Sequence, residues 1–193
     1  AERNAMRATS YGTGLLIADA LKRGCRKIIV GAGGSATSDC GVGLLTALGY
    51  RFFDRMGCEI DALRGAEILP LIASIDSSAC MPELREAEFV VASDVSAPLY
   101  GKGGAAFVFS PQKGAEAKEV ELLDSAMREF SRVVTQYTHS DLSQVAGAGS
   151  AGGIGYALIS LLGARIESGV ELLLEYADFD SLAKGCDLVV TGE

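Results

Sequence analysis

Apolar residues recur every three or four positions in several parts of the chain, which is the spacing of one face of an α-helix. The clearest example lies between Glu116 and Tyr137. A second helix is predicted from Thr13 to Arg23, because basic residues occupy its last turn and Gly24 follows it. Further helices are predicted within 39–49, within 146–164 after a loop of small residues, and over 169–185 as one helix or a helix pair.

Short runs rich in valine, isoleucine and phenylalanine alternate with these helices and predict strands. They are "RKIIVGA" at 26–32, "YRFFD" at 50–54, "EFVVASDV" at 88–95 and "CDLVVTG" at 186–192, whereas 62–82 is interpreted as short helical turns followed by a polar loop. Strand, glycine-rich turn and helix follow one another at 26–49, which is the first half of a βαβ unit and favours a parallel sheet. We therefore predict an α/β fold in three layers (α/β/α) with a mostly parallel sheet, as a single domain over 1–193.

Composition and charge narrow the class of partner. The chain of 193 residues is 49% hydrophobic and has a formal charge of −8. This charge argues against nucleic acid, since such binders neutralise phosphates with lysine and arginine. An anionic ligand would need a local site of backbone N–H groups, one or two lysines or a metal. No apolar run reaches the ~18 residues of a membrane span and no signal sequence opens the chain, so we expect a cytoplasmic protein without membrane contact.

The cysteines and the single histidine do not form a zinc-binding pattern. Five cysteines are scattered without a C-x-x-C pair and His139 stands alone, so reduced, buried thiols are expected. The chain begins at Ala1 and stops on an apolar run, which we interpret as one part of a longer polypeptide.

The loop "GAGGSATSD" after the first predicted strand fits two kinds of ligand site. "GAGGSA" matches the dinucleotide fingerprint G-x-G-x-x-A, and Asp54 lies where a ribose-binding acid would be expected. The alternative is a cradle for a phosphate or carboxylate, in which glycines let the backbone approach an anion and the next helix presents its N-terminus. Ser35 and Thr37 would add hydroxyl donors, and Asp39 is either a helix cap or a ligand for a metal or a substrate hydroxyl.

Two further segments carry candidate chemistry. Asp94 ends a predicted strand, the position at which ligands bind in open α/β sheets, and Lys113 in "SPQKGA" is either a phosphate-binding or a solvated lysine. "GAGSAGGIG" at 147–155 opens a helix with small residues that either allow close packing or form a second anion site. The terminal "TGE" places Glu193 just beyond a predicted strand.

Five sequence blocks, taken together and in order, resemble one known family. They are "TSYGTGLLIADAL", "GGSATSDCGVGLLTALG", "SDVSAPLYGKGGAAFVFSPQKGA", "GAGSAGGIG" and "LVVTGE", and the resemblance is to the bacterial glycerate kinases, from about Thr9 to the last residue. It implies an ATP- and Mg²⁺-dependent kinase that phosphorylates glycerate to phosphoglycerate. It also implies two α/β domains with the active site in the cleft between them, of which this chain resembles the middle portion and one lobe.

The resemblance also assigns roles to residues. Asp39 or Asp94 would orient the attacking hydroxyl or hold Mg²⁺, with Asp94 as the metal candidate, and Lys113 would stabilise developing charge. Ser38 and Cys40 stand where the family tends to have Asn and Gly. The substrate carboxylate or the transferred phosphoryl group would be bound by Gly33, Gly34, Ser35, Thr37, Ser38 and Gln112, and the nucleotide phosphates by Gly149, Gly152, Gly153 and Glu193.

Two other functions stay open at this level. An NAD(P)-binding Rossmann-type oxidoreductase domain would use "GAGGSA" and Asp54, but it leaves "PQKGA" and "GAGSAGG" unexplained. A catalytically incomplete fragment would bind one ligand and lack the partner lobe that closes over ATP.

Overall fold

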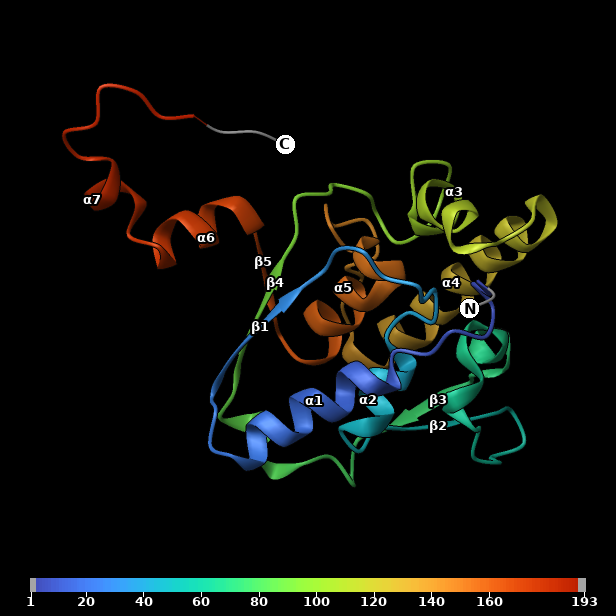
Figure 1. Ribbon diagram of the computed structural model, residues 1–193. Coiled ribbons are helices and arrows are strands. Elements are labelled where there is room, and N and C mark those ends of the chain that lie inside the picture. The colour runs from blue at the N-terminus through green and yellow to red at the C-terminus, as the bar shows by residue number, and fades with distance from the viewer. Residues whose placement is uncertain (1–2, 191–193) are drawn as a thin grey trace.

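A parallel sheet forms the centre of the computed structural model, which describes residues 3–190 (Figure 1). Its strands are β1 (Lys27–Gly31), β4 (Glu88–Ala92) and β5 (Arg165–Glu167), in the order β1-β4-β5. Both pairings are parallel. The predicted α/β class with a mostly parallel sheet is therefore confirmed.

The register of the sheet brings the ends of its first two strands together. Gly31 is paired with Ala92, and the N–H of Ala32 donates to the Ala92 carbonyl at 2.9 Å. Because the strands are parallel, the loops that follow β1 and β4 leave the sheet at the same edge. This is the edge at which ligands bind in open α/β sheets.

Most of the helices lie on one side of the sheet (Figure 1). These are α1 (Tyr11–Lys22), α2 (Val42–Ala47), α4 (Ala117–Thr138) and α5 (Ser150–Leu161). The long helix α4 has the apolar stripe that its sequence predicts and begins at a capping box formed by Glu116 and Glu119. The core beneath these helices contains the fully buried side chains of Leu21, Leu44, Leu45, Phe52, Phe130 and Tyr156.

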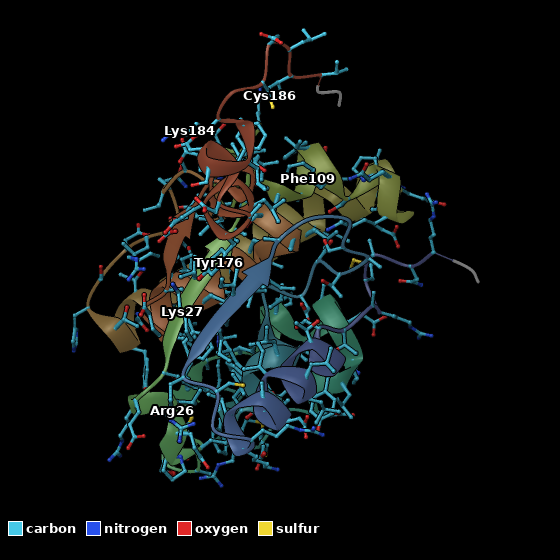
Figure 2. All side chains as sticks on the ribbon, turned by 60° about the vertical axis from the view of Figure 1, so that its left-hand side comes forward. Arg26, Lys27, Phe109, Tyr176, Lys184 and Cys186 are labelled. Atoms are coloured by element: carbon cyan, nitrogen blue, oxygen red, sulfur yellow. The ribbon has the colours of Figure 1, made fainter. Side chains whose placement is uncertain are left out.

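The opposite face of the sheet is met by α6 (Gly169–Tyr176), which continues into α7 (Phe179–Ala183). The Lys27 ammonium lies 5.4 Å from the centroid of the Tyr176 ring, and Figure 2 shows the two side chains next to each other. This helix is the third layer, and it leaves Ile29 of β1 41% exposed.

The remaining elements are short. The strands β2 (Arg51–Phe53) and β3 (Ser74–Asp76) form a separate antiparallel pair. The helical turns and short helices are η1 (Ala62–Leu71), η2 (Pro82–Arg85), α3 (Ala105–Phe109) and η3 (Pro111–Lys113). Within residues 3–190, no helix is both long enough and apolar enough to cross a bilayer.

The predicted strand "CDLVVTG" is wrong as far as residues 186–190 show. This segment is irregular, and Leu188, Val189 and Val190 are exposed. An apolar run becomes a strand only where a neighbouring strand supplies hydrogen-bond partners, and within the described residues none pairs with it.

Candidate active site

Several segments that are distant in sequence meet at the carboxyl edge of the sheet (Figure 1). Loop 32–41 follows β1 and loop 93–104 follows β4. The segment before α1, the turn η3 and the start of α5 contribute further residues to the cavities at this edge. The strand register fixes the position of loops 32–41 and 93–104. The cavities show which residues of the segment before α1, of η3 and of the start of α5 lie next to loop 32–41.

A basic pocket and a connecting pocket lie next to each other on loop 32–41. The basic pocket has a volume of about 610 Å³ and is lined by Arg3, Asn4, Arg7, Ala8, Gly34, Ser35, Ala36, Gln112 and Lys113. The connecting pocket, of about 120 Å³, is lined by Ala32, Gly33, Gly34, Ser35, Val95, Phe109, Gln112, Lys113 and Ala151.

An apolar pocket of about 720 Å³ lies on the other side of the connecting pocket and shares Ala32, Gly33 and Val95 with it. Its lining includes Asp94 and the apolar side chains Ile29, Val95, Val170, Leu172, Leu173 and Tyr176. The basic, connecting and apolar pockets therefore form a continuous strip along loop 32–41, with cations at one end and apolar side chains at the other.

The glycines of loop 32–41 expose backbone to this strip. Gly33 and Gly34 are exposed, and a Cβ atom added to either would have no heavy atom within 4 Å. Gly34 also has φ +61°, a left-handed conformation that glycine adopts without strain. The predicted anion cradle is thus an open loop whose backbone a ligand can approach closely.

Lys113 lies under this loop and is 5% exposed, so it is not the solvated lysine that its sequence position allowed. Its ammonium donates to the Ser35 hydroxyl at 3.0 Å and to the Thr37 carbonyl at 2.6 Å. Because an ammonium has three N–H donors, one donor is left for a ligand in the basic or the connecting pocket. Lys113 ends η3, which is followed by Gly114 in a left-handed conformation at φ +94°.

Burial lowers the pKa of Lys113 from 10.5 to about 8, although the nearby Asp39 acts in the opposite direction. Removing an ammonium from water disfavours its charged form, and a bound anion would restore it. The charge of this lysine is therefore sensitive both to ligand and to pH in the physiological range.

Asp39 acts as a cap rather than as an exposed ligand. Its carboxylate is fully buried and accepts hydrogen bonds from the N–H and hydroxyl of Ser10, both at 2.8 Å, and from the N–H groups of Gly41 at 3.1 Å and Gly43 at 3.3 Å. The hydroxyl of Ser10 in turn accepts from the N–H of Leu44 at 2.9 Å. These contacts occupy the N-terminus of α2, so neither Asp39 nor that N-terminus is open to a substrate or a metal.

Ser38 and Thr37 were both predicted to bind substrate, but neither is among the described lining residues of the three pockets. Ser38 is fully buried and its hydroxyl shares a 3.3 Å hydrogen bond with that of Ser110, which turns it away from the pockets. The Thr37 hydroxyl is buried without a hydrogen-bond partner in the described part of the chain. Ser35 and Gln112 line the basic pocket, and their contact with substrate stays a prediction.

The small-residue segment at the start of α5 supports loop 32–41 from behind. Gly152 and Gly153 have φ of +68° and +92°, and a Cβ atom on Gly152 would lie 2.0 Å from the Thr37 carbonyl oxygen. The N–H of Cys40 donates to the Gly152 carbonyl at 3.1 Å. Gly149 is also buried, against the backbone of Pro98. Close packing therefore explains these three glycines, and of this turn only Ala151 lines the connecting pocket.

Asp94 lies at the carboxyl end of β4 and is exposed. Its Oδ1 accepts from the Ser168 hydroxyl at 2.9 Å and from the N–H of Gly169 at 3.0 Å, which ties the carboxylate to the first turn of α6. Its Oδ2 has no hydrogen bond to the described residues. Asp94 is the one carboxylate among the described lining residues of the three pockets.

The geometry contradicts the dinucleotide alternative. A ribose-binding acid would follow the strand next to β1 in the parallel sheet, but Asp54 follows β2 of the separate antiparallel pair. Its Oδ1 accepts from the N–H groups of Met56 and Cys58 within a local turn. The match of "GAGGSA" to the fingerprint is therefore coincidental.

Sequence reasoning missed Arg3 and Arg7, which supply two of the three cations in the basic pocket. They precede the first predicted helix, and their only signal was the clustering of basic residues in "ERNAMR". The candidate nucleotide residue Glu193 lies outside the described residues.

Comparisons with known proteins show the family of this chain. The family model described as "Glycerate kinase family" matches residues 1–193. The chain is 42% identical over 192 residues to a glycerate kinase of Bacillus cereus and 41% identical over 192 residues to the glycerate 2-kinase of Escherichia coli. Each match covers 100% of this chain and 50% of the relative, so the chain spans about half the length of the curated relatives it matches.

A solved structure has the same fold over the same extent. It comes from Salmonella typhimurium LT2 and is assigned as a glycerate kinase 2. It matches with a TM-score of 0.90 and 41% sequence identity, over 99% of this chain and 51% of the solved chain.

Proposed function

Because the chain belongs to the glycerate kinase family, we propose that it provides the acceptor and transfer sites of an ATP-dependent kinase that converts glycerate to phosphoglycerate. The observation that carries this proposal is the strip of three pockets along loop 32–41, with Lys113 in contact with the connecting pocket. A kinase with an anionic acceptor needs an anion site for that acceptor and an apolar site for its nucleotide, and they must meet where the phosphoryl group is transferred.

The basic pocket is the proposed glycerate site. Within residues 3–190, its lining contains three cations and no carboxylate, which favours a small anion although the chain as a whole has a charge of −8. The remaining N–H of Lys113 and the open backbone at Gly33 and Gly34 would hold the transferred phosphoryl group. Preorganised donors at this position stabilise the charge that develops in the transition state.

The apolar pocket is the proposed nucleotide site. Its volume of about 720 Å³ lies within the range of roughly 300–1,000 Å³ typical of small-molecule sites. Tyr176 and Leu173 offer apolar surface to a base, and the phosphates would extend through the connecting pocket toward Lys113.

Asp94 fits the way in which proteins hold Mg²⁺ together with a nucleotide. Among residues 3–190 no group of three or more ligating side chains is found, and Mg²⁺ is commonly held by one or two carboxylates plus substrate phosphates and waters. The free Oδ2 of Asp94 would serve as that carboxylate oxygen, while Oδ1 is kept in place by Ser168 and Gly169. When bound, Mg²⁺ neutralises charge on the phosphates of ATP.

The reaction follows as an in-line displacement. A hydroxyl oxygen of glycerate attacks the γ-phosphorus of ATP, the bond from that phosphorus to the bridging oxygen breaks, and ADP leaves with the bonding electrons. The hydroxyl proton is released to solvent. Lys113 holds the transferred group, the basic pocket orients the acceptor, and little covalent chemistry is asked of the protein.

The test is release of ADP from Mg-ATP by the full-length protein, with phosphoglycerate identified as the second product. We expect turnover that depends on glycerate and is lost when glycerate is omitted. An Asp94→Asn variant should keep its fold but lower kcat by about 100-fold or more, since it weakens the hold on charge at the transfer site. Absence of glycerate-dependent ADP, or saturable micromolar binding of NAD(H), would contradict the proposal.

A further inference from the structure

The segment before α1 and loop 32–41 line the same basic pocket. Arg3 and Arg7 of the segment line it together with Gly34, Ser35 and Lys113. The transfer steps described above use the positive charge of these arginines but assign neither of them a bond to the acceptor. Two arginines thus line a pocket that already contains a lysine.

The segment has a fixed conformation. The Asn4 side-chain oxygen accepts from the N–H groups of Met6 at 3.0 Å and Arg7 at 2.9 Å, and the N–H of Ala8 donates to the Asn4 carbonyl at 3.1 Å. Ala5 is 1% exposed. These contacts make residues 4–8 a closed turn whose backbone is anchored in the core.

Two glycines from other parts of the chain hold this turn in place. A Cβ atom on Gly65 would lie 2.6 Å from the Arg7 carbonyl carbon, and one on Gly114 would lie 2.7 Å from the Arg3 carbonyl oxygen. Both glycines have positive φ, so the backbone approaches the turn where a larger residue would displace it. Because Gly114 directly follows Lys113, the last residue of η3, the same contact also fixes the position of Arg3 relative to Lys113.

Within the described residues, each of these two arginine side chains makes one hydrogen bond or ion pair. Arg3 donates from Nη1 to the Gln112 carbonyl at 2.9 Å, and Arg7 donates from Nε to Glu67 at 3.0 Å. A guanidinium has five N–H donors in a planar fork that matches a carboxylate. The remaining donors are available to the basic pocket, whose lining contains no acidic side chain in the part of the chain that the structure describes.

We infer that Arg3 and Arg7 bind the carboxylate of the acceptor and thereby select small hydroxy acids over neutral polyols and amides. This inference rests on the proposed kinase function and extends it, since it divides the basic pocket into a carboxylate end at the arginines and a phosphoryl end at Lys113. Bidentate pairing suits this task, because it fixes the orientation of a planar carboxylate as well as its position. The hydroxyl to be phosphorylated is then directed toward loop 32–41.

The test compares glycerate with glyceramide, its neutral amide of similar shape, in the full-length protein. For Arg3→Gln and Arg7→Gln we expect the Kd of glycerate, measured by calorimetry, to rise about 10- to 100-fold, as for loss of a charge-assisted hydrogen bond. The Kd of glyceramide and the KM for ATP should change by no more than about twofold, the spread usual for context effects. The preference for the acid over the amide therefore falls.

A matched control is Arg64→Gln. Arg64 pairs with the same Glu67 at 3.6 Å but is not among the lining residues of the basic pocket. It should leave the Kd of glycerate unchanged, which separates loss of pocket charge from loss of the ion pair with Glu67.

The binding and turnover measurements distinguish failure of the carboxylate assignment from failure of the proposed kinase function. If the wild-type protein turns over glycerate but the two arginine variants bind it as tightly as wild type, the carboxylate assignment is overturned and the kinase function stands. A rise in the KM for ATP with an unchanged Kd of glycerate would also overturn it, because the arginines would then bind nucleotide phosphates. If the wild-type protein does not phosphorylate glycerate, the proposed function itself fails.

Discussion

Lys113 and Asp39 are two buried charged residues, of which Asp39 belongs to loop 32–41 and Lys113 contacts it. Their polar atoms are used differently. Asp39 accepts four hydrogen bonds from Ser10, Gly41 and Gly43. Lys113 makes two, to Ser35 and Thr37, and keeps a donor for a ligand. A buried charge whose partners are all in the protein is structural, whereas one with an unused donor beside a cavity is suited to binding.

The lowered pKa of Lys113 predicts a pH dependence. Because its pKa in the folded protein is about 8 rather than 10.5, the ammonium needed for anion binding is lost as the pH rises through about 8. We expect kcat/KM for glycerate to fall above that pH. The kcat, which is measured at saturating glycerate, should fall only at a higher pH, because the bound anion raises the pKa of Lys113. In Lys113→Arg the decline should disappear from the range up to about pH 10, because arginine stays protonated.

The lowered pKa of Lys113 also predicts how the stability of the protein changes with pH. Between about pH 8 and 10.5 the unfolded chain holds more protons on this lysine than the folded chain, so the free energy of unfolding should rise with pH across that window. A Lys113→Met variant should not show this rise. A wild-type profile of kcat/KM that is flat from pH 7 to 10 would contradict the assignment of Lys113 as the anion donor.

The sequence singled out both residues but did not separate their roles. Asp39 could be read as a cap or a ligand, and the choice depended on Ser10, which is 29 positions away in the sequence. Lys113 was equally compatible with a solvated side chain, because its burial comes from loop 32–41. Contacts between distant segments decide such roles, and a local pattern does not contain them.

At the scale of elements, Asp39 and Ser10 connect the starts of two helices. Ser10 immediately precedes α1, and Asp39 together with Ser10 satisfies the first N–H groups of α2. The glycine-rich turn at Gly152 and Gly153 packs on the same loop from the other side. Loop 32–41 is therefore held in place mainly by the elements around it, in addition to the hydrogen bond from Gly41 to Asp39 within the loop.

This arrangement predicts that Asp39→Asn acts mainly on stability. An asparagine would turn an NH₂ group toward N–H donors inside the core, so we expect the free energy of unfolding in urea to fall by about 2–4 kcal/mol. Asp61→Asn is the matched control, since Asp61 caps η1 through the N–H of Leu63 but is exposed. Its cost should stay below about 1 kcal/mol.

The contrary outcome is specific. An Asp39→Asn protein that unfolds at the wild-type urea concentration but has lost all turnover would make Asp39 a catalytic group. The burial of the Asp39 carboxylate argues instead for the loss of stability.

Long periodic segments were predictable, whereas of the three-residue strands only β2, which lies within the predicted strand at 50–54, was predicted. The helix predicted from Glu116 to Tyr137 corresponds to α4, and the strand predicted at 26–32 corresponds to β1. The strands β3 and β5 are three residues long and too short to show alternation. They exist because neighbouring strands pair with them.

At the scale of the whole molecule, a chain with a formal charge of −8 concentrates three cations in one pocket. The sequence predicted that an anionic ligand would need a local site, and the family resemblance indicated its chemistry. It did not predict that residues before the first helix would complete that site. Arg3 meets η3 only because Gly114 brings their backbones together, across more than 100 positions of sequence.

The most direct test of the account is a crystal structure of the full-length protein with glycerate and a non-hydrolysable ATP analogue. We predict the glycerate carboxylate within hydrogen-bond distance of Arg3 and Arg7, and the terminal phosphate beside Lys113 and the backbone of Gly33 and Gly34. The adenine should occupy the apolar pocket near Tyr176. Glycerate bound outside the basic pocket, or a terminal phosphate distant from Lys113, would contradict the account.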